Sequence, residues 1–220
     1  MAISRRRLLT VTGGVAGVIA GAGALGRFLD PRTPMNYEFP DVAEAAPVLP
    51  ATLSCPAADV TKSQAEGPYY RPNTPLRTVL REAGTVGIPL LIEGRVLGTD
   101  CRPIAGAVLD VWSGDGNGVY DRDGFNLRGH QFTDSRGAFR IKTVRPSDYW
   151  WFGIHRTPHV HVKVQGRDTS LLMTQLYFPG ESLNASDWLF DDSLLLKIDE
   201  SDDRSQHASF DFVLTRRDKV

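Results

Sequence analysis

Residues 156–164 read Arg-Thr-Pro-His-Val-His-Val-Lys-Val, so that polar and apolar residues alternate with a period of two from His159 onward. This period is typical of a β-strand, in which successive side chains point to opposite faces of the sheet. We therefore expect His159 and His161 to share one face and the intervening valines to point into a core. Two imidazoles placed in this way can bind one metal ion, although half-exposed histidines are also common on strands.

Further strand candidates lie on both sides of this segment, separated by Gly, Asp and Pro turn signals. With it, they cover residues 88–97, 107–112, 138–144, 159–164, 172–178, 194–198 and 210–214. A short helical turn is expected around residues 184–189. Short strands without long helices between them predict an all-β fold, an antiparallel β-sandwich with long active-site loops.

The chain has 220 residues, enough for one domain with its own core, and 41% of them are hydrophobic. Its formal net charge is -1, which argues against a nucleic-acid partner because such proteins normally present a basic face. Glycine (21) and proline (14) are plentiful, in keeping with many turns. No internal repeat of 20–50 residues is visible.

The N-terminus resembles an export signal. Ser4-Arg-Arg-Arg-Leu-Leu9 precedes a weakly apolar, Gly- and Ala-rich run, the pattern of a twin-arginine signal peptide over residues 1–30. A transmembrane helix is the alternative, but glycines make a poor apolar span. The sequence leaves the cleavage site open, after Ala24 or after Ala45. The twin-arginine machinery would then be a partner, and the product would be periplasmic or extracellular.

Residues 31–58 are rich in proline and alanine and are expected to be a tether, followed by the main domain at 59–220. Cys55 and Cys101 are the only cysteines. In an oxidising compartment they could form one disulfide, and two buried free thiols are the alternative.

Tyrosines are the other candidate metal ligands. Tyr149 lies ten residues before His159, and Tyr120 ends a Gly-rich loop that follows the strand at 107–112. A phenol with a pKa of about 10 needs a strongly Lewis-acidic ion to coordinate as phenolate at neutral pH. Fe(III) suits such a mixed set of imidazoles and phenolates, whereas soft metals do not. By position alone, however, tyrosines at strand ends are usually packing residues.

Several ordered motifs together resemble the intradiol ring-cleavage dioxygenases. They are Glu66-Gly-Pro-Tyr-Tyr70, Gly106-Ala-Val-Leu-Asp-Val-Trp112, Gly118-Val-Tyr120, the run at 127–149, the segment at 156–164 and Thr174-Gln-Leu-Tyr-Phe-Pro-Gly180. The resemblance covers about residues 60–215. It implies cleavage of a catechol-type ring between its two hydroxylated carbons, with O₂, to a muconate-type diacid.

The resemblance also implies a non-haem Fe(III) bound by Tyr120, Tyr149, His159 and His161. The motif of Tyr120 is the least distinctive, and the 29 residues from Tyr120 to Tyr149 are fewer than in many members of the family. No organic cofactor is implied.

Three further roles follow from the resemblance. Arg156 is expected to stabilise negative charge on the substrate, Gln175 to lie beside that arginine, and Tyr149 to take up a substrate proton. Trp151 is expected to line the substrate pocket, although Trp150 and Phe152 flank it and either ring could take that place.

The substrate is left open among catechol, substituted catechols and protocatechuate, because several arginines could bind an acidic substituent. The oligomeric state is also open. Two other interpretations remain: a non-catalytic, transthyretin-like binding protein of the cell envelope, and a copper–zinc β-sandwich enzyme. The second would need six histidines for its dinuclear site, and this chain has five.

Overall fold

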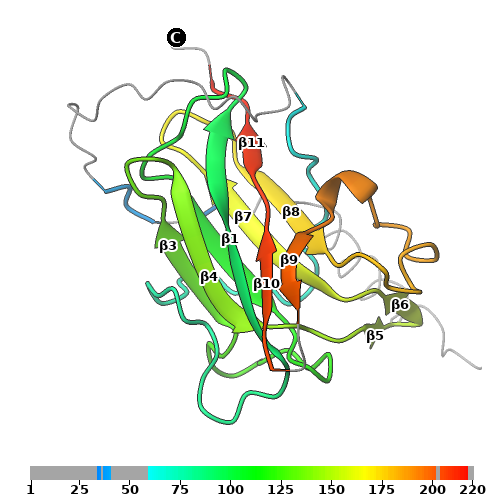
Figure 1. The fold of residues 1–220 in the computed structure, drawn as a ribbon. Helices are drawn as coiled ribbons and strands as arrows, with labels where there is room; N and C mark the ends of the chain where they lie inside the picture. Colours follow the sequence, from blue (N-terminus) through cyan, green and yellow to red (C-terminus); the bar gives the residue numbers. More distant parts are fainter. Residues whose placement is uncertain (1–33, 36, 41–58, 202–203, 218–220) are drawn as a thin grey trace, which may run out of the picture.

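The computed structural model describes residues 34–35, 37–40, 59–201 and 204–217 (Figure 1). Within these ranges almost all regular structure is strand. The elements, in chain order, are β1 (Pro89–Gly98), β2 (Val108–Ser113), β3 (Arg128–Phe132), β4 (Ala138–Val144), β5 (Tyr149–Trp151), β6 (Ile154–Arg156), β7 (His159–Gln165), β8 (Leu172–Tyr177), the 3₁₀ helix η1 (Asp192–Leu194), β9 (Lys197–Ser201), β10 (Gln206–Ser209) and β11 (Phe212–Leu214).

Two sheets lie face to face (Figure 1). One has the order β3-β2-β7-β8, and all of its pairs are antiparallel. The other is centred on β1, which pairs with β4 along one edge and with β10 and then β11 along the opposite edge; β9 pairs with β10. A separate hairpin is formed by β5 and β6. The predicted all-β sandwich is confirmed.

The sheet around β1 is mixed, because β1 runs parallel to both β10 and β11. The strand expected at 210–214 is observed as the shorter β11, and β10, which was not expected, precedes it in the same direction along β1. The chain passes from one to the other at Phe210, whose carbonyl oxygen would lie 1.8 Å from a Cβ added to Gly94. Only a glycine at this point of β1 leaves room for that passage.

The main core lies between the two sheets. Ile92 and Val96 of β1 pack there against Leu109 and Val111 of β2. The inward residues of β7 are Val160, Val162 and Val164, each 0% exposed, as the alternation predicted. One face of β7 therefore belongs to the apolar core.

Strands β3, β5 and β6 were not predicted, and the strand expected at 194–198 lies further along as β9. Around residues 184–189 the structure has hydrogen-bonded turns, including one from the Asp187 N–H to the Leu183 carbonyl (3.0 Å). None of the described residues belongs to a helix long and apolar enough to cross a membrane. The expected signal at 1–30 lies outside the described residues.

A described piece of the expected tether lies on the domain. The Tyr37 hydroxyl donates to Oδ2 of Asp110 on β2 (2.9 Å), and the Tyr37 ring stacks on His130 of β3 at 4.0 Å. Cys101 is disulfide-bonded, in agreement with the first of the two cysteine alternatives. Cys55, its expected partner, lies outside the described residues.

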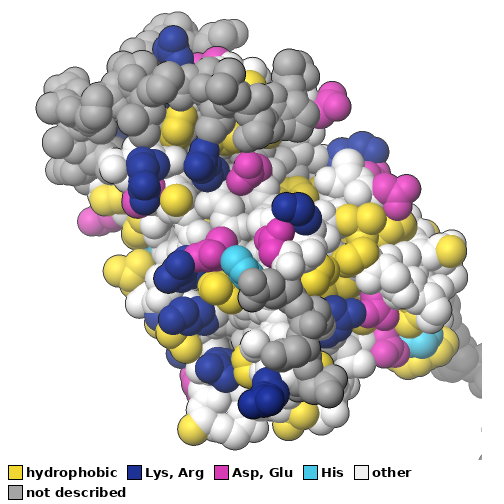
Figure 2. Space-filling view, in the orientation of Figure 1, with side chains coloured by type: hydrophobic (Ala, Val, Ile, Leu, Met, Phe, Trp, Pro, Cys, Tyr) yellow, Lys and Arg dark blue, Asp and Glu magenta, His cyan; other side chains and the backbone are white. Residues whose placement is uncertain are grey.

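The outward face of the sheet around β1 shows basic and acidic side chains interspersed (Figure 2). On this face Arg140 of β4 and His207 of β10 both pair with Glu93 of β1. Such mixed charge is typical of a solvated surface.

Candidate active site

The second face of β7 is also buried, but its neighbours are aromatic and polar. His159, His161 and Lys163 are at most 2% exposed. They are covered by an aromatic cluster that is separate from the main core. Its buried members are Ala65, Trp112, Tyr120, Tyr149, Trp151 and Met173.

The two histidines present nitrogen atoms to the same point. Their Nε2 atoms are 3.1 Å apart, close to the separation of about 3 Å expected for two nitrogens that each lie about 2.1 Å from one metal ion. The Nδ1–H of His159 donates to the Thr157 carbonyl (2.6 Å), which leaves the lone pair on Nε2. The ring of His161 is held against Trp112, nearly parallel at 4° and 4.9 Å.

Burial keeps both imidazoles neutral, the form that binds metals. It lowers the pKa of His159 well below 6.5, and the positive charge of Arg156 acts in the same direction. The pKa of His161 is lowered for the same two reasons, and by His159 as well.

Tyr120 and Tyr149 meet beside the histidines. Their ring centroids are 5.2 Å apart, Tyr149 is 5.5 Å from His159, and Tyr120 is 6.2 Å from His161. Gly118 makes this possible: it has a φ of +74°, and a Cβ there would lie 2.2 Å from the Asp148 carbonyl oxygen. The loop before Tyr120 thus packs directly on the residue before Tyr149.

The tyrosine hydroxyls suit a cation at this point. The Tyr149 hydroxyl is buried and has no hydrogen-bond partner among the described residues. Burial raises the pKa of Tyr149 to about 12, and the pKa of Tyr120 well above 10. Among the described residues, no three His, Cys, Asp or Glu side chains come together as a metal site. The side chains that do lie beside the two histidines are those of Tyr120 and Tyr149.

Arg156 is fully buried beside the tyrosines and fixed by its neighbours. Its Nε–H donates to both Asp187 carboxylate oxygens (3.1 and 2.9 Å), and Nη2 donates to Oε1 of Gln175 (2.6 Å). Burial works to lower the pKa of Arg156, but Tyr149 and Asp187 outweigh it, so that the pKa is raised. The expected contact between Arg156 and Gln175 is therefore present.

Asp187 was not among the predicted site residues, and no sequence signal points to it. Its carboxylate also accepts the backbone N–H groups of Thr157 (2.9 Å) and Leu189 (3.0 Å). The ion pair with Arg156 is 0% exposed on both sides. Asp187 thus ties the turn after β8 to the segment between β6 and β7.

The Glu66-Gly-Pro motif covers the histidines. Gly67 has a φ of +76°, and a Cβ there would lie 3.1 Å from Cε1 of His161. Glu66 pairs with the buried Lys163 (2.5 Å), whose ammonium also lies 3.5 Å from the centroid of the Tyr70 ring. The motif thus needs a glycine against the imidazole and a carboxylate for the buried lysine.

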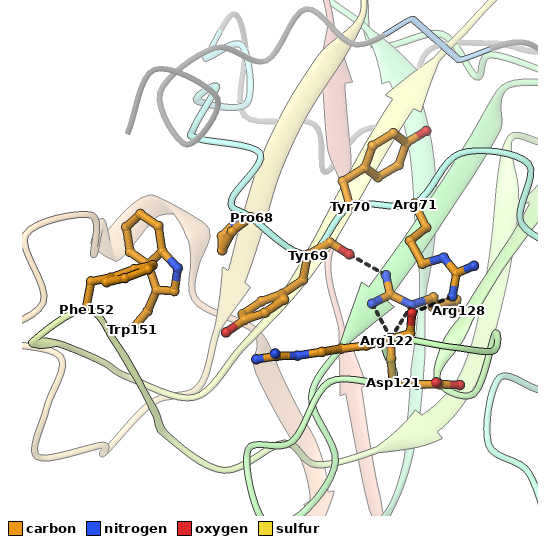
Figure 3. Close-up of a pocket in the computed structure, with 9 residues that line it drawn as sticks. All are labelled: Pro68, Tyr69, Tyr70, Arg71, Asp121, Arg122, Arg128, Trp151 and Phe152. Carbon is orange, nitrogen blue, oxygen red and sulfur yellow. Dashed lines mark hydrogen bonds between the residues drawn. The ribbon is translucent and has the colours of Figure 1, made fainter. Parts of the chain in front are cut away.

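Two neighbouring cavities reach this site. One, of about 590 Å³, is lined by Tyr120 and Tyr149. The other, of about 410 Å³, is lined by Trp151 and Phe152 (Figure 3). Trp151 is thus a cavity-lining ring; Trp150 lines the first cavity instead and stacks on His155 at 4.2 Å.

The other three histidines have partners elsewhere. His130 bonds Thr74, His155 pairs with Asp148, and His207 pairs with Glu93. The pair on β7 therefore converges with tyrosines, which is not the arrangement of a copper–zinc site.

Two imidazoles and two phenols thus converge beside a buried arginine in a β-sandwich, and the two phenols line a cavity. Comparison with known proteins identifies the family. The family described as Dioxygenase matches residues 65–216. The chain belongs to the intradiol dioxygenase family, as the resemblance predicted.

Individual relatives match this chain at moderate sequence identity and over only part of its length. Catechol 1,2-dioxygenase of Candida albicans is 30% identical over 141 residues, which are 53% of this chain and 46% of that protein. Chlorocatechol 1,2-dioxygenase of Pseudomonas putida is 31% identical over 178 residues, 69% of this chain and 66% of that protein. This chain therefore spans less than two thirds of either relative.

A solved structure covers the domain more fully. The dioxygenase domain of a dioxygenase–carbohydrate-binding fusion protein from Streptomyces sp. SirexAA-E has a TM-score of 0.66 and 45% identity. The alignment covers 72% of this chain and 99% of that one.

Proposed function

We propose that this protein is a non-haem Fe(III)-dependent intradiol dioxygenase. It cleaves a catechol-type ring between the hydroxylated carbons, with O₂, to a muconate-type diacid. The observation that carries the proposal is the convergence of two neutral histidines with the buried, unpartnered Tyr149 hydroxyl. The relatives support it, since they are named catechol and chlorocatechol 1,2-dioxygenases.

The donor set fits Fe(III), on which the family generally depends. Tyr120, Tyr149, His159 and His161 would hold the ion. When bound, it would act as a Lewis acid that lowers the pKa of coordinated hydroxyl groups and orients the diol.

Tyr149 would move a proton at its hydroxyl oxygen. Burial raises the pKa of Tyr149 to about 12, and the positive charge of Arg156 acts in the opposite direction. An ionised Tyr149 that is not bound to a cation would thus be a base strong enough to take a proton from a catechol hydroxyl.

Arg156 supplies a fixed positive charge. Because Asp187 and Gln175 already hold its guanidinium, no reorganisation is needed when negative charge develops on the substrate. Gln175 is itself fixed, since its Nε2 donates to the Ala65 carbonyl (2.9 Å).

Iron loading and a visible spectrum test this function. The Fe(III) protein should show a tyrosinate charge-transfer band that shifts when catechol is added without O₂, and a ring-opened diacid should form once O₂ is admitted. Tyr149→Phe should alter the band. Tyr37→Phe, which removes a hydroxyl bonded to Asp110 away from the site, is the matched control and should leave it unchanged. A colourless iron protein that forms no diacid would contradict the proposal.

We also propose that the chain is exported by the twin-arginine route to the periplasm or the cell exterior. The support is the Ser4-Arg-Arg-Arg-Leu-Leu9 pattern and the weakly apolar run behind it. Replacing Arg5 and Arg6 together by lysine should retain the protein in the cytoplasm, as measured by cell fractionation. Export of the double variant at the normal level would contradict this route.

A further inference from the structure

We infer that the site accepts a catechol whose ring carries a side chain ending in a carboxylate, and that the Arg122 guanidinium binds this carboxylate. This inference rests on the proposed function and names the substrate class. Three observations support it: two adjoining cavities, the hydrogen bonding of the arginines that line them, and an aromatic wall formed by Trp151 and Phe152.

Arg122 lies where the two cavities adjoin. Of the residues that line them, only Tyr69 and Arg122 belong to both. The cavity with Tyr120 and Tyr149 would receive the diol, and the cavity with Trp151 leads away from it. Ligand-binding cavities in proteins typically have volumes of about 300–1,000 Å³. The two cavities together are therefore large enough for a ligand bigger than one aromatic ring. A substituent that leaves the diol cavity therefore passes Arg122.

The guanidinium of Arg122 has no hydrogen bond or ion pair within the described part of the chain. It lies 5.6 Å from the centroid of the Tyr69 ring. Figure 3 shows this side chain extended beneath that ring, with the guanidinium at its hydroxyl end, toward Trp151 and Phe152. All of its N–H donors are thus available to a ligand.

The other two arginines of the second cavity are already bonded. Arg128 donates to the carbonyls of Tyr69 (2.6 Å) and Asp121 (2.8 Å). Arg71 donates to the carbonyls of Arg122 (3.0 Å) and Gly124 (2.9 Å). They hold the loop that presents Arg122 and add positive charge without competing for the ligand.

Two carboxylates line the same cavities, and each has other partners. Asp121 accepts the backbone N–H groups of Gly124 (2.8 Å) and Asn126 (2.8 Å). Asp148 pairs with His155 at 2.6 Å. Neither carboxylate is paired with Arg122, so its positive charge stays available to an anion.

An aromatic wall faces Arg122 across the cavity (Figure 3). Phe152 is 86% exposed and has a φ of +45°, a conformation that is uncommon for a residue of this size. Trp151 beside it is buried. Both rings line the same cavity, where they would cover the apolar part of the side chain.

Equilibrium binding followed by tryptophan fluorescence tests the inference. The ligands are hydrocaffeate, its neutral methyl ester, and phenylpropionate, which keeps the acid but lacks the diol. The wild type should bind hydrocaffeate about fivefold more tightly than the ester, the size expected for a partly exposed ion pair. This preference should shrink as salt is added.

Arg122→Gln should abolish the preference for the acid over the ester, and Arg122→Lys should retain part of it. Arg136→Gln is the matched control, because that exposed arginine on the β3–β4 turn lines neither cavity and should change nothing. Equal affinities for acid and ester in the wild type, or an unchanged ratio in Arg122→Gln, would overturn the inference.

The two proposals fail in different ways. If catechols are cleaved but the acid and the ester bind equally, the carboxylate subsite is wrong and the proposed function stands. If phenylpropionate binding depends on Arg122 but no catechol is cleaved, the subsite stands and the function is wrong.

Discussion

The two faces of β7 are buried to the same degree but have different roles: one packs in the apolar core, and the other lies in the candidate active site. Val160, Val162 and Val164 face the apolar core between the sheets, whereas His159 and His161 face tyrosines and a buried arginine. Burial alone therefore does not distinguish core from site in this protein. The chemistry of the partners does.

The energetics of the two faces differ accordingly. Each buried valine stabilises the fold by roughly 1.5–3 kcal/mol through apolar surface removed from water. On the other face, the ion pairs of Arg156 and Lys163 have lost their hydration, and such pairs contribute little net stability. The valine face therefore stabilises the sandwich, and the histidine face holds reactive groups in position.

The largest effect on stability is expected where a charge on the histidine face loses its partner. Asp187→Ala leaves Arg156 buried without its carboxylate and should lower the free energy of unfolding by about 3–5 kcal/mol. Urea denaturation of the metal-free protein measures this. Asp187→Asn also removes the charge but keeps an oxygen acceptor, so it should lose somewhat less. Stability of Asp187→Asn close to that of the wild type would show that the charge is not the cause.

On the valine face, Leu176→Ala should lower the free energy of unfolding by about 2–5 kcal/mol, because Leu176 of β8 is 0% exposed in the main core. Leu176→Met, which conserves volume, should lose less than about 1.5 kcal/mol. Both variants should still bind iron in full at low temperature. Loss of iron from the folded variants would mean that the two faces are not independent.

A substitution on the histidine face should separate function from stability. We expect His161→Gln to reduce iron content and ring cleavage at least about a hundredfold, since even residues that only support a ligand cost 10–100-fold. The metal-free protein should lose less stability than Leu176→Ala does. Metal analysis and O₂ uptake measure the first effect, and urea denaturation the second. A greater loss of stability than in Leu176→Ala would break the contrast between the faces.

The smallest effect concerns the surface pair Lys62–Asp191, which lies outside both faces of β7. The Lys62 hydrogen bond, with one from Ser193, lowers the pKa of Asp191 below its ordinary value of 3.8. Its stabilisation is therefore present above pH 3.8 and lost as pH falls through the lowered pKa. Lys62→Ala should cost about 0.2–1 kcal/mol at neutral pH, and nothing at the acid end, in urea titrations at both pH values. A loss that persists in acid would exclude an electrostatic origin.

The sequence predicted the features that follow from a regular alternation along one strand or from a family motif. The alternation through His159 and His161 gave β7 and the faces of its side chains, and the motifs gave the contact of Arg156 with Gln175. These features depend on residues close in sequence or on a strong family pattern.

The contacts that could not be predicted join residues that are distant in sequence and follow no local pattern. Asp187 reaches Arg156 across 31 residues from a turn, and Arg122 is distinguished only because its neighbours are already bonded. Strand β3 was missed because Arg-Gly-His-Gln-Phe has no apolar alternation. Its Arg128 is buried by bonds to backbone carbonyls rather than by hydrophobicity.

The parallel pairing of β1 with β10 and β11 has a consequence for the order of folding. Leu90 is paired with Gln206, more than a hundred residues later, so the sheet around β1 stays incomplete until most of the domain has left the ribosome. Contacts of such sequence separation form slowly, and until then β1 exposes an unsatisfied edge. Assembly of this domain is therefore expected to be largely post-translational, with the nascent chain most prone to aggregation just before its last two strands emerge.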